Sequence, residues 1–145
     1  MGVEYARRVL IADADAAVRQ QLFSALLDND IFSDCVLTVP DALEKLDAQK
    51  YGVIVLDVAL PGTDVGMVID RISAIPSKER PVVLILASRP EATRSLDVEI
   101  VQIVLRKPVV LAHVVDLVGS CLRSAAARLA MPQDARKKKG DQLTS

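Results

Sequence analysis

The sequence predicts an α/β domain on a doubly wound, five-stranded parallel sheet, and two features of the chain support this. Short runs of β-branched and other aliphatic residues alternate five times with longer segments of helical pattern. The short runs are apolar at nearly every position, which is typical of strands that helices cover on both faces. With right-handed crossovers this alternation gives a three-layer sandwich, and 145 residues suffice for one such domain.

Five strands and five helices are expected in strict alternation. The strands are Val9–Ala12, Cys35–Val39, Val53–Asp57, Val82–Ala87 and Val101–Leu105. The helices are about Asp15–Leu27, Pro40–Ala48, Asp64–Ile75, Pro90–Asp97 and Pro108–Ala130. In the first helix, apolar residues recur at helical spacing at Val18, Leu22, Ala25 and Leu26.

The last helix is predicted to begin at Pro108, which suits the first helical position. Apolar residues continue around the helix, at Val109, Val110, Val114, Val115, Leu117, Val118, Cys121 and Leu122. A helix that is apolar nearly all round must bury more than one face, so we expect a homodimer or another partner to cover it. The alternative is a core face followed by an alanine-rich overhang. If the helix forms the dimer, charged substitutions at exposed apolar positions such as Val118 or Leu122 are expected to give monomers.

Composition narrows the class of partner. The net charge is −1 and Trp is absent, so neither nucleic acid nor a membrane is expected as a partner. No apolar stretch reaches the ~20 residues that a membrane span needs.

Cys35 and Cys121 are far apart and no signal peptide is evident, so we expect reduced, buried thiols in a cytoplasmic protein. After residue 130 the composition changes, which predicts a domain over residues 1–130 and a disordered, polar and basic tail over 131–145.

Charged residues end three of the predicted strands. Asp13 follows the first strand, Asp57 ends the third, and Lys107 follows the fifth. Because the carboxyl ends of parallel strands meet at one edge, we expect these three side chains to converge there. Asp13 alone is equally explained as a helix cap. Asp57 is followed by a loop containing Pro61 and Gly62, so it is not an immediate cap.

Three motifs in this order resemble the receiver domains of response regulators, the CheY-like family with a flavodoxin-like fold. The segment from Val9 to Arg19 resembles the first strand and acidic turn of that family. Residues Val53 to Asp64 resemble its phosphoacceptor strand and loop, and Arg106-Lys107-Pro108 resembles its Lys-Pro signature. The order and spacing agree over roughly residues 7–125.

The resemblance implies a phosphorylation site. Asp57 would be the nucleophile that accepts a phosphoryl group from the phosphohistidine of a histidine kinase. A Mg²⁺ ion would be held by Asp13, Asp57 and the backbone carbonyl of Ala59, and Lys107 would supply a second positive charge. The expected catalysis is at most self-catalysed phosphorylation and dephosphorylation of the aspartate.

The chain departs from the family pattern in its acidic turn. The family has two adjacent carboxylates there, and the second one contacts the metal directly. Here the pair is Asp13-Ala14, so we expect weak or absent Mg²⁺ binding unless Asp15 reaches the ion.

Three further departures concern the switch. The family's phosphoryl-binding Ser or Thr is Leu86 here, which cannot donate a hydrogen bond, although Ser88 lies two residues on. The family's switch aromatic is Val104, and the Gly after the loop's acidic residue is Val65.

These departures lead us to expect a stand-alone, atypical or phosphorylation-independent module of two-component signalling. It would act through protein–protein contacts with a histidine kinase or another signalling protein. The first alternative is a conventional regulator that a histidine kinase phosphorylates on Asp57. The second is a small nucleotide- or flavin-binding domain, which the lack of a glycine-rich loop after the first strand disfavours.

Overall fold

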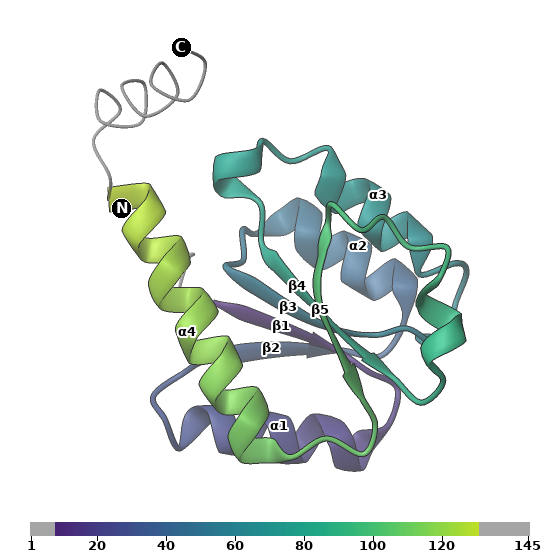
Figure 1. Cartoon of the computed structure of the whole chain (residues 1–145), viewed down its shortest axis with the longest axis horizontal. Helices are drawn as coiled ribbons and strands as arrows, with labels where there is room; N and C mark the ends of the chain where they lie inside the picture. Colours follow the sequence, from purple (N-terminus) through teal and green to yellow (C-terminus); the bar gives the residue numbers. More distant parts are fainter. Residues whose placement is uncertain (1–7, 131–145) are drawn as a thin grey trace.

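The computed structural model describes residues 8–130, in which five parallel strands form one sheet of order β2-β1-β3-β4-β5 (Figure 1). The strands are β1 Val9–Ala12, β2 Ser33–Val36, β3 Val53–Asp57, β4 Val82–Ala87 and β5 Val101–Arg106. The predicted doubly wound sheet is therefore confirmed. The order reverses at β1, which has β2 on one side and β3 on the other. The tail predicted for residues 131–145 lies outside the described residues.

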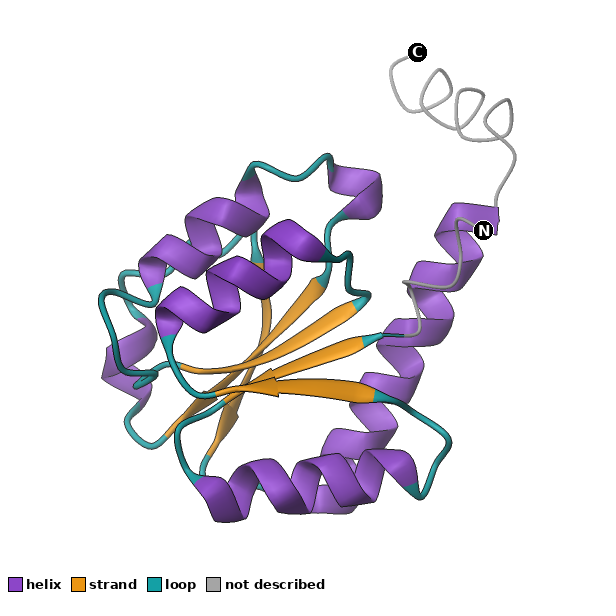
Figure 2. Ribbon diagram, turned by 180° about the vertical axis from the view of Figure 1, so that it is seen from behind, coloured by secondary structure: helices purple, strands orange, loops and turns teal. Residues whose placement is uncertain are grey.

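Helices cover both faces of the sheet (Figure 2). They are α1 Ala16–Leu27, α2 Val39–Ala48, α3 Gly66–Ser73 and α4 Leu111–Ala130, with a short 3₁₀ helix η2 at Ser77–Glu79. α1 and α4 pack on one face, over β-strand residues such as Val9 and Ile11, and α2 and α3 pack on the other. Side chains start two of these helices: Asp15 accepts the backbone N–H groups of Ala17 and Val18, and Thr38 accepts that of Asp41.

The fourth predicted helix, Pro90–Asp97, is not a helix of that length. The segment forms only the 3₁₀ turn η3, Pro90–Thr93. Leu96 is buried there but Val98 is 87% exposed, so the segment has too few apolar contacts to hold a full helix on the sheet. β5 consequently alternates between half-buried and exposed residues, instead of being covered on both faces.

The last helix also differs from the prediction. It begins at Leu111 rather than at Pro108, and the Lys107–Pro108 peptide bond is cis. Val118 and Leu122, which were expected to be exposed, are buried against the sheet. The exposed side chains described in α4 are small, polar or charged: Ala112, His113, Asp116, Ser120, Arg123, Ser124 and Ala127. Among residues 8–130, no helix is long and apolar enough to cross a membrane.

The two cysteines were both expected to be buried, and this is wrong for one of them. Cys121 lies in α4 and is partly buried against the core. Cys35 is exposed, because β2 is an edge strand and α1 does not cover it completely. Both thiols are free.

Candidate functional site

The predicted convergence of Asp13 and Asp57 follows from the pairing of β1 with β3. Ala12 pairs with Leu56, so the residues that follow each of them come to the same edge. The exposed fraction is 1% for Asp13 and 8% for Asp57, and these are the only buried charged residues among the side chains that the structure describes. Two carboxylates buried side by side need positive charge nearby.

Lys107 supplies that charge. Its backbone N–H donates to the carbonyl of Ala87 at 2.9 Å, which continues the pairing of β4 with β5 past the last strand residue. Its Nζ lies 2.8 Å from Oδ2 of Asp13 and 3.2 Å from Oδ2 of Asp57. One ammonium group therefore bridges both carboxylates, and the three predicted side chains lie together.

Burial and charge act against each other in this cluster. Burial raises the pKa of the Asp13 carboxyl above its ordinary value, although Lys107 and the amide of Asp15 oppose the shift. Burial disfavours the charged form of Lys107, but the contacts with Asp13 and Asp57 outweigh it and raise the pKa of the ammonium. Lys107 is therefore positively charged at neutral pH.

The other carboxylate oxygens are engaged by backbone amides. Oδ1 of Asp13 accepts the N–H of Asp15 at 2.9 Å, and Oδ1 of Asp57 accepts the N–H of Ala59 at 3.0 Å. Asp15 uses its own Oδ1 to cap α1. Its carboxylate therefore has a structural role and does not replace the one that Ala14 lacks.

The residues that would hold Mg²⁺ are Asp13, Asp57 and the backbone carbonyl of Ala59, at one edge of the sheet. The Lys107 ammonium contacts both carboxylates. Across the described residues, no group of three or more His, Cys, Asp or Glu side chains is placed to hold a metal ion. Mg²⁺ favours several oxygen ligands and loses its water reluctantly, and this edge offers it two carboxylates that also contact an ammonium group.

The positions where the chain departs from the receiver pattern are occupied by packing residues. Leu86 is fully buried, in register with Asp57, and its carbonyl accepts the N–H of Val58 at 3.0 Å. Val65 is buried in the core beneath α2 and α3. Val104 is 46% exposed, on the face of β5 that has no helix over it. Ser88 is exposed and lines a hollow of about 330 Å³ that also includes Lys107 and Asp15.

Arg19 is a contributor that the sequence did not reveal. Its guanidinium donates to the carbonyl oxygens of Asp13 at 2.8 Å and Ala14 at 2.9 Å. This holds the acidic turn against the start of α1. No local sequence pattern identifies such a contact, because it depends on how the turn folds back on the helix.

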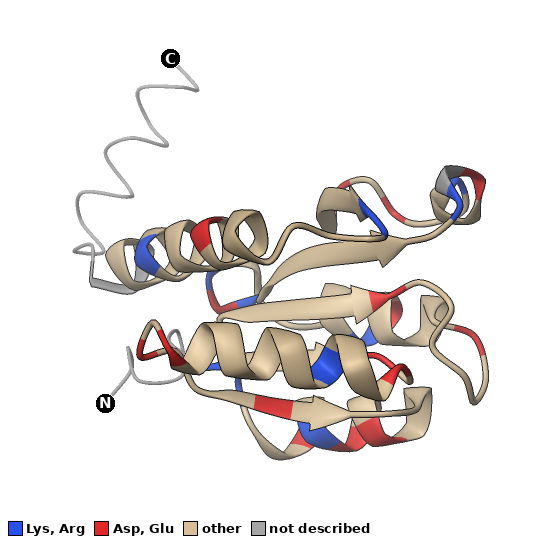
Figure 3. Cartoon of the chain, turned by 90° about the horizontal axis from the view of Figure 1, so that it is seen from below, with Lys and Arg blue, Asp and Glu red and all other residues tan. Residues whose placement is uncertain are grey.

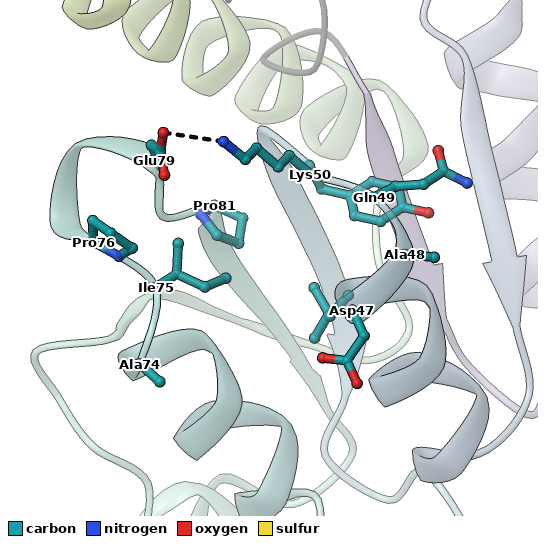
Figure 4. A pocket seen from close by; sticks show the side chains of 11 residues that line it. Asp47, Ala48, Gln49, Lys50, Ala74, Ile75, Pro76, Glu79 and Pro81 are labelled. Carbon is teal, nitrogen blue, oxygen red and sulfur yellow. Dashed lines mark hydrogen bonds and ion pairs between the residues drawn. The ribbon is translucent and has the colours of Figure 1, made fainter.

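A second hollow, of about 450 Å³, lies at the opposite end of the strands (Figure 4). It is formed by the segments that precede β3 and β4, and the ion pair between Lys50 and Glu79, 3.0 Å long, lies beside it. Asp57 lies at the carboxyl end of β3, whereas this hollow lies at the amino end. The hollow is therefore separate from the candidate site.

The comparisons with known proteins agree with the fold and with the resemblance. A family model described as the response regulator receiver domain matches residues 9–118. No curated protein sequence matches the chain.

Several solved structures share the fold. A response regulator signal receiver domain from Bermanella marisrubri superposes with a TM-score of 0.70 at 20% identity, over 80% of this chain and 98% of that one. A sensor protein from Polaromonas sp. JS666 gives a TM-score of 0.69 at 20% identity, over 81% and 97% of the two chains. The response regulator protein TrrA from Thermotoga maritima, in complex with Mg²⁺ and BeF, gives 0.68 at 18% identity, over 79% and 97%.

Proposed function

This chain belongs to the response regulator receiver domain family, and from that premise we propose that it is an atypical receiver that signals without depending on phosphorylation of Asp57. It acts through protein–protein contacts, with a histidine kinase or another signalling protein of the cytoplasm as partner. Its catalysis extends at most to phosphorylation and dephosphorylation of its own aspartate.

The observation that carries this proposal is the alanine at position 14, which leaves the site two carboxylates. The Lys107 ammonium contacts both Asp13 and Asp57 and neutralises one of their two charges. A divalent cation therefore finds only two carboxylates, both already in contact with an ammonium group. A Mg²⁺ site formed by Asp13, Asp57 and the carbonyl of Ala59 is therefore weak in our proposal.

The lack of a responsive switch supports the same proposal. A phosphoryl group on Asp57 meets no hydroxyl donor from the adjacent strand, because the residue in register is the buried Leu86. Val104 is too short to act as a moving aromatic side chain. Losing one partner that stabilises charge in the transition state costs about 10²–10³ in rate.

The conventional alternative rests on Asp57 and Lys107, which both remain in place 3.2 Å apart. In that alternative Asp57 is the phosphoacceptor and Lys107 neutralises the transferred group. A nucleotide- or flavin-binding role is less well supported, because the turn after β1 presents carboxylates rather than glycines.

Phosphorylation of the intact protein distinguishes the two. After treatment with acetyl phosphate and Mg²⁺, mass spectrometry should find wild type almost unmodified. Asp57→Ala, which lacks the acceptor carboxylate, is the negative control. Ala14→Asp restores a carboxylate at an exposed position, so it should bind Mg²⁺ more tightly and react faster, by about tenfold or more. In cells, Asp57→Ala should keep most signalling activity. Stoichiometric phosphorylation of wild type, together with loss of signalling in Asp57→Ala, would establish the conventional function instead.

A further inference from the structure

The edge of the sheet formed by β2 and α1 carries an unusual amount of exposed apolar surface. The chain has two phenylalanines, and both are exposed there: Phe23 of α1 by 38% and Phe32 before β2 by 72%. Leu27 of α1 is 42% exposed and Leu37 after β2 is 47% exposed. Several exposed apolar side chains on adjoining elements mark interaction sites more often than single ones do. We call these four residues the β2 edge cluster.

The strand beside this cluster has an open edge. β2 pairs with β1 alone, so within residues 8–130 its outer backbone groups have no strand partner. Figure 3 looks onto this side and shows the outermost strand next to α1. Such edges are commonly guarded by a charged side chain. Here the one charge of the strand, Asp34, is partly buried and accepts a 2.7 Å hydrogen bond from the Tyr51 hydroxyl, so it is not free at the edge.

The other edge of the sheet is better protected. β5 exposes Gln102 and Arg106, with Val104 between them. Of these exposed side chains Arg106 is charged, and a charged side chain on an edge strand discourages pairing with another strand. The β2 edge is therefore the one suited to strand pairing.

We propose that the β2 edge is an interface between two copies of this chain, whose β2 strands pair antiparallel about a two-fold axis at Cys35. Directly opposite residues of antiparallel strands point to the same face, and a two-fold axis perpendicular to the sheet preserves the faces. The axis must therefore pass midway between the two copies of one residue. At Asp34 it would place two carboxylates opposite each other, which is unfavourable. At Cys35 it places the two thiols opposite each other and Asp34 opposite Val36.

Charge along the edge fits a two-fold pairing of identical chains. α1 runs antiparallel to β2, so Asp28 and Asp30 lie where β2 begins, and Arg19 lies toward the end where β2 finishes. Antiparallel pairing brings Arg19 of each copy toward Asp28 and Asp30 of the other. A hollow of about 360 Å³ lined by Arg19, Phe23 and Cys35 opens beside the axis and can take an apolar side chain of the second copy. This surface is distinct from α4 and independent of the state of Asp57.

Sedimentation of the full chain tests the interface. Wild type should be a dimer at micromolar concentration, and Phe32→Lys and Leu27→Lys should each weaken dimerisation by about tenfold or more. Val98→Lys is the matched control, because Val98 is 87% exposed but lies in the segment before β5. Circular dichroism checks that all variants are folded. A monomeric wild type, or a dimer that Val98→Lys weakens as much as Phe32→Lys does, would overturn the proposal.

Cross-linking tests the register. In Cys121→Ser, diamide should convert two Cys35 thiols into one disulfide between chains, taking up their two electrons and two protons. Cys35→Ser should give no such product. Leu37→Cys, in a chain lacking both native thiols, is the matched control on the same edge. Its two sulfurs would lie about 13 Å apart along the paired strands, beyond the reach of a disulfide. Equal cross-linking at positions 35 and 37 would contradict the register and with it the proposal.

Discussion

At the scale of single residues, Lys107 determines the state of the candidate site. Asp13 and Asp57 are nearly inaccessible to water, and the ammonium group lies between them. A buried ion pair of this kind contributes little net stability compared with an apolar core, but removing one member leaves charge uncompensated. The cluster therefore has a structural role as well as its proposed chemical one.

Lys107→Met keeps most of the side-chain volume and removes the charge. The two carboxylates then repel each other, so we expect the free energy of unfolding to fall by about 3 kcal/mol at neutral pH in urea denaturation. Lys50→Met is the matched control, since Lys50 is exposed in its ion pair with Glu79 and should cost under about 1 kcal/mol. Adding Asp57→Asn to Lys107→Met should recover most of the loss. Equal effects of the two lysine substitutions would contradict the structural role of Lys107.

At the scale of elements, the loop that follows Asp57 is tied to the start of α2. The N–H of Val39 donates to the carbonyl of Pro61 at 2.8 Å. The next residue, Gly62, has φ +122°, and a Cβ there would lie 2.7 Å from Cδ of Pro40. The backbone conformation and the close approach both require glycine, so this loop holds Ala59 beside Asp57 at the cost of tolerance to substitution.

Gly62→Ala should therefore lower the free energy of unfolding by about 1–3 kcal/mol, through backbone strain and the clash with α2. Gly119→Ala is a control for which we expect the opposite change in the free energy of unfolding. Gly119 lies inside α4 and its added methyl group would meet only Nη1 of Arg123, at 3.4 Å. Alanine in a helix interior is favoured by up to about 1 kcal/mol, so that variant should be slightly more stable. Thermal melts of both variants measure the difference, and a neutral Gly62→Ala would refute the close packing of the loop on α2.

At the scale of the whole molecule, the sheet separates the surfaces that could carry function. The carboxyl ends of the strands hold the cluster of Asp13, Asp57 and Lys107, and the amino ends hold the hollow beside Lys50 and Glu79. The β2 edge is joined to the centre of the sheet by the hydrogen bond from Tyr51 to Asp34. This contact links residues 17 positions apart in sequence and couples an edge strand to global stability.

The Tyr51 contact predicts a pH dependence. Burial, with the hydrogen bond to Asp34 and its charge, raises the pKa of the Tyr51 phenol well above its ordinary value. In the unfolded chain tyrosine ionises near pH 10, whereas the folded chain keeps the proton, so stability is present below about pH 10 and falls as pH rises above it. Tyr51→Phe should lose about 1–2 kcal/mol at neutral pH, and its deficit should shrink above about pH 10. A deficit that stays constant between pH 7 and 11, measured in urea, would contradict this linkage.

Much of this architecture could be predicted from the sequence, because it depends on local patterns and on a topological rule. Apolar runs identified all five strands, although β2 was expected over Cys35–Val39 and it spans Ser33–Val36, with Val39 already in α2. The carboxyl ends of parallel strands meet on one side of the sheet, so the sequence predicts that Asp13, Asp57 and Lys107 lie close together. The family motifs, with Ala14 and Leu86 in place of a carboxylate and a hydroxyl, are also properties of the sequence.

What only the tertiary structure decided was how side chains of distant segments meet. Helical spacing could not show that the segment after Pro90 has too little to pack against, or that Val118 and Leu122 face the core. The bridge from Lys107 to both carboxylates, the hold of Arg19 on the acidic turn and the exposure of both phenylalanines depend on packing between elements. Periodicity tells which residues share a face, but the neighbour of that face, and therefore its burial and charge environment, is fixed only when the chain folds.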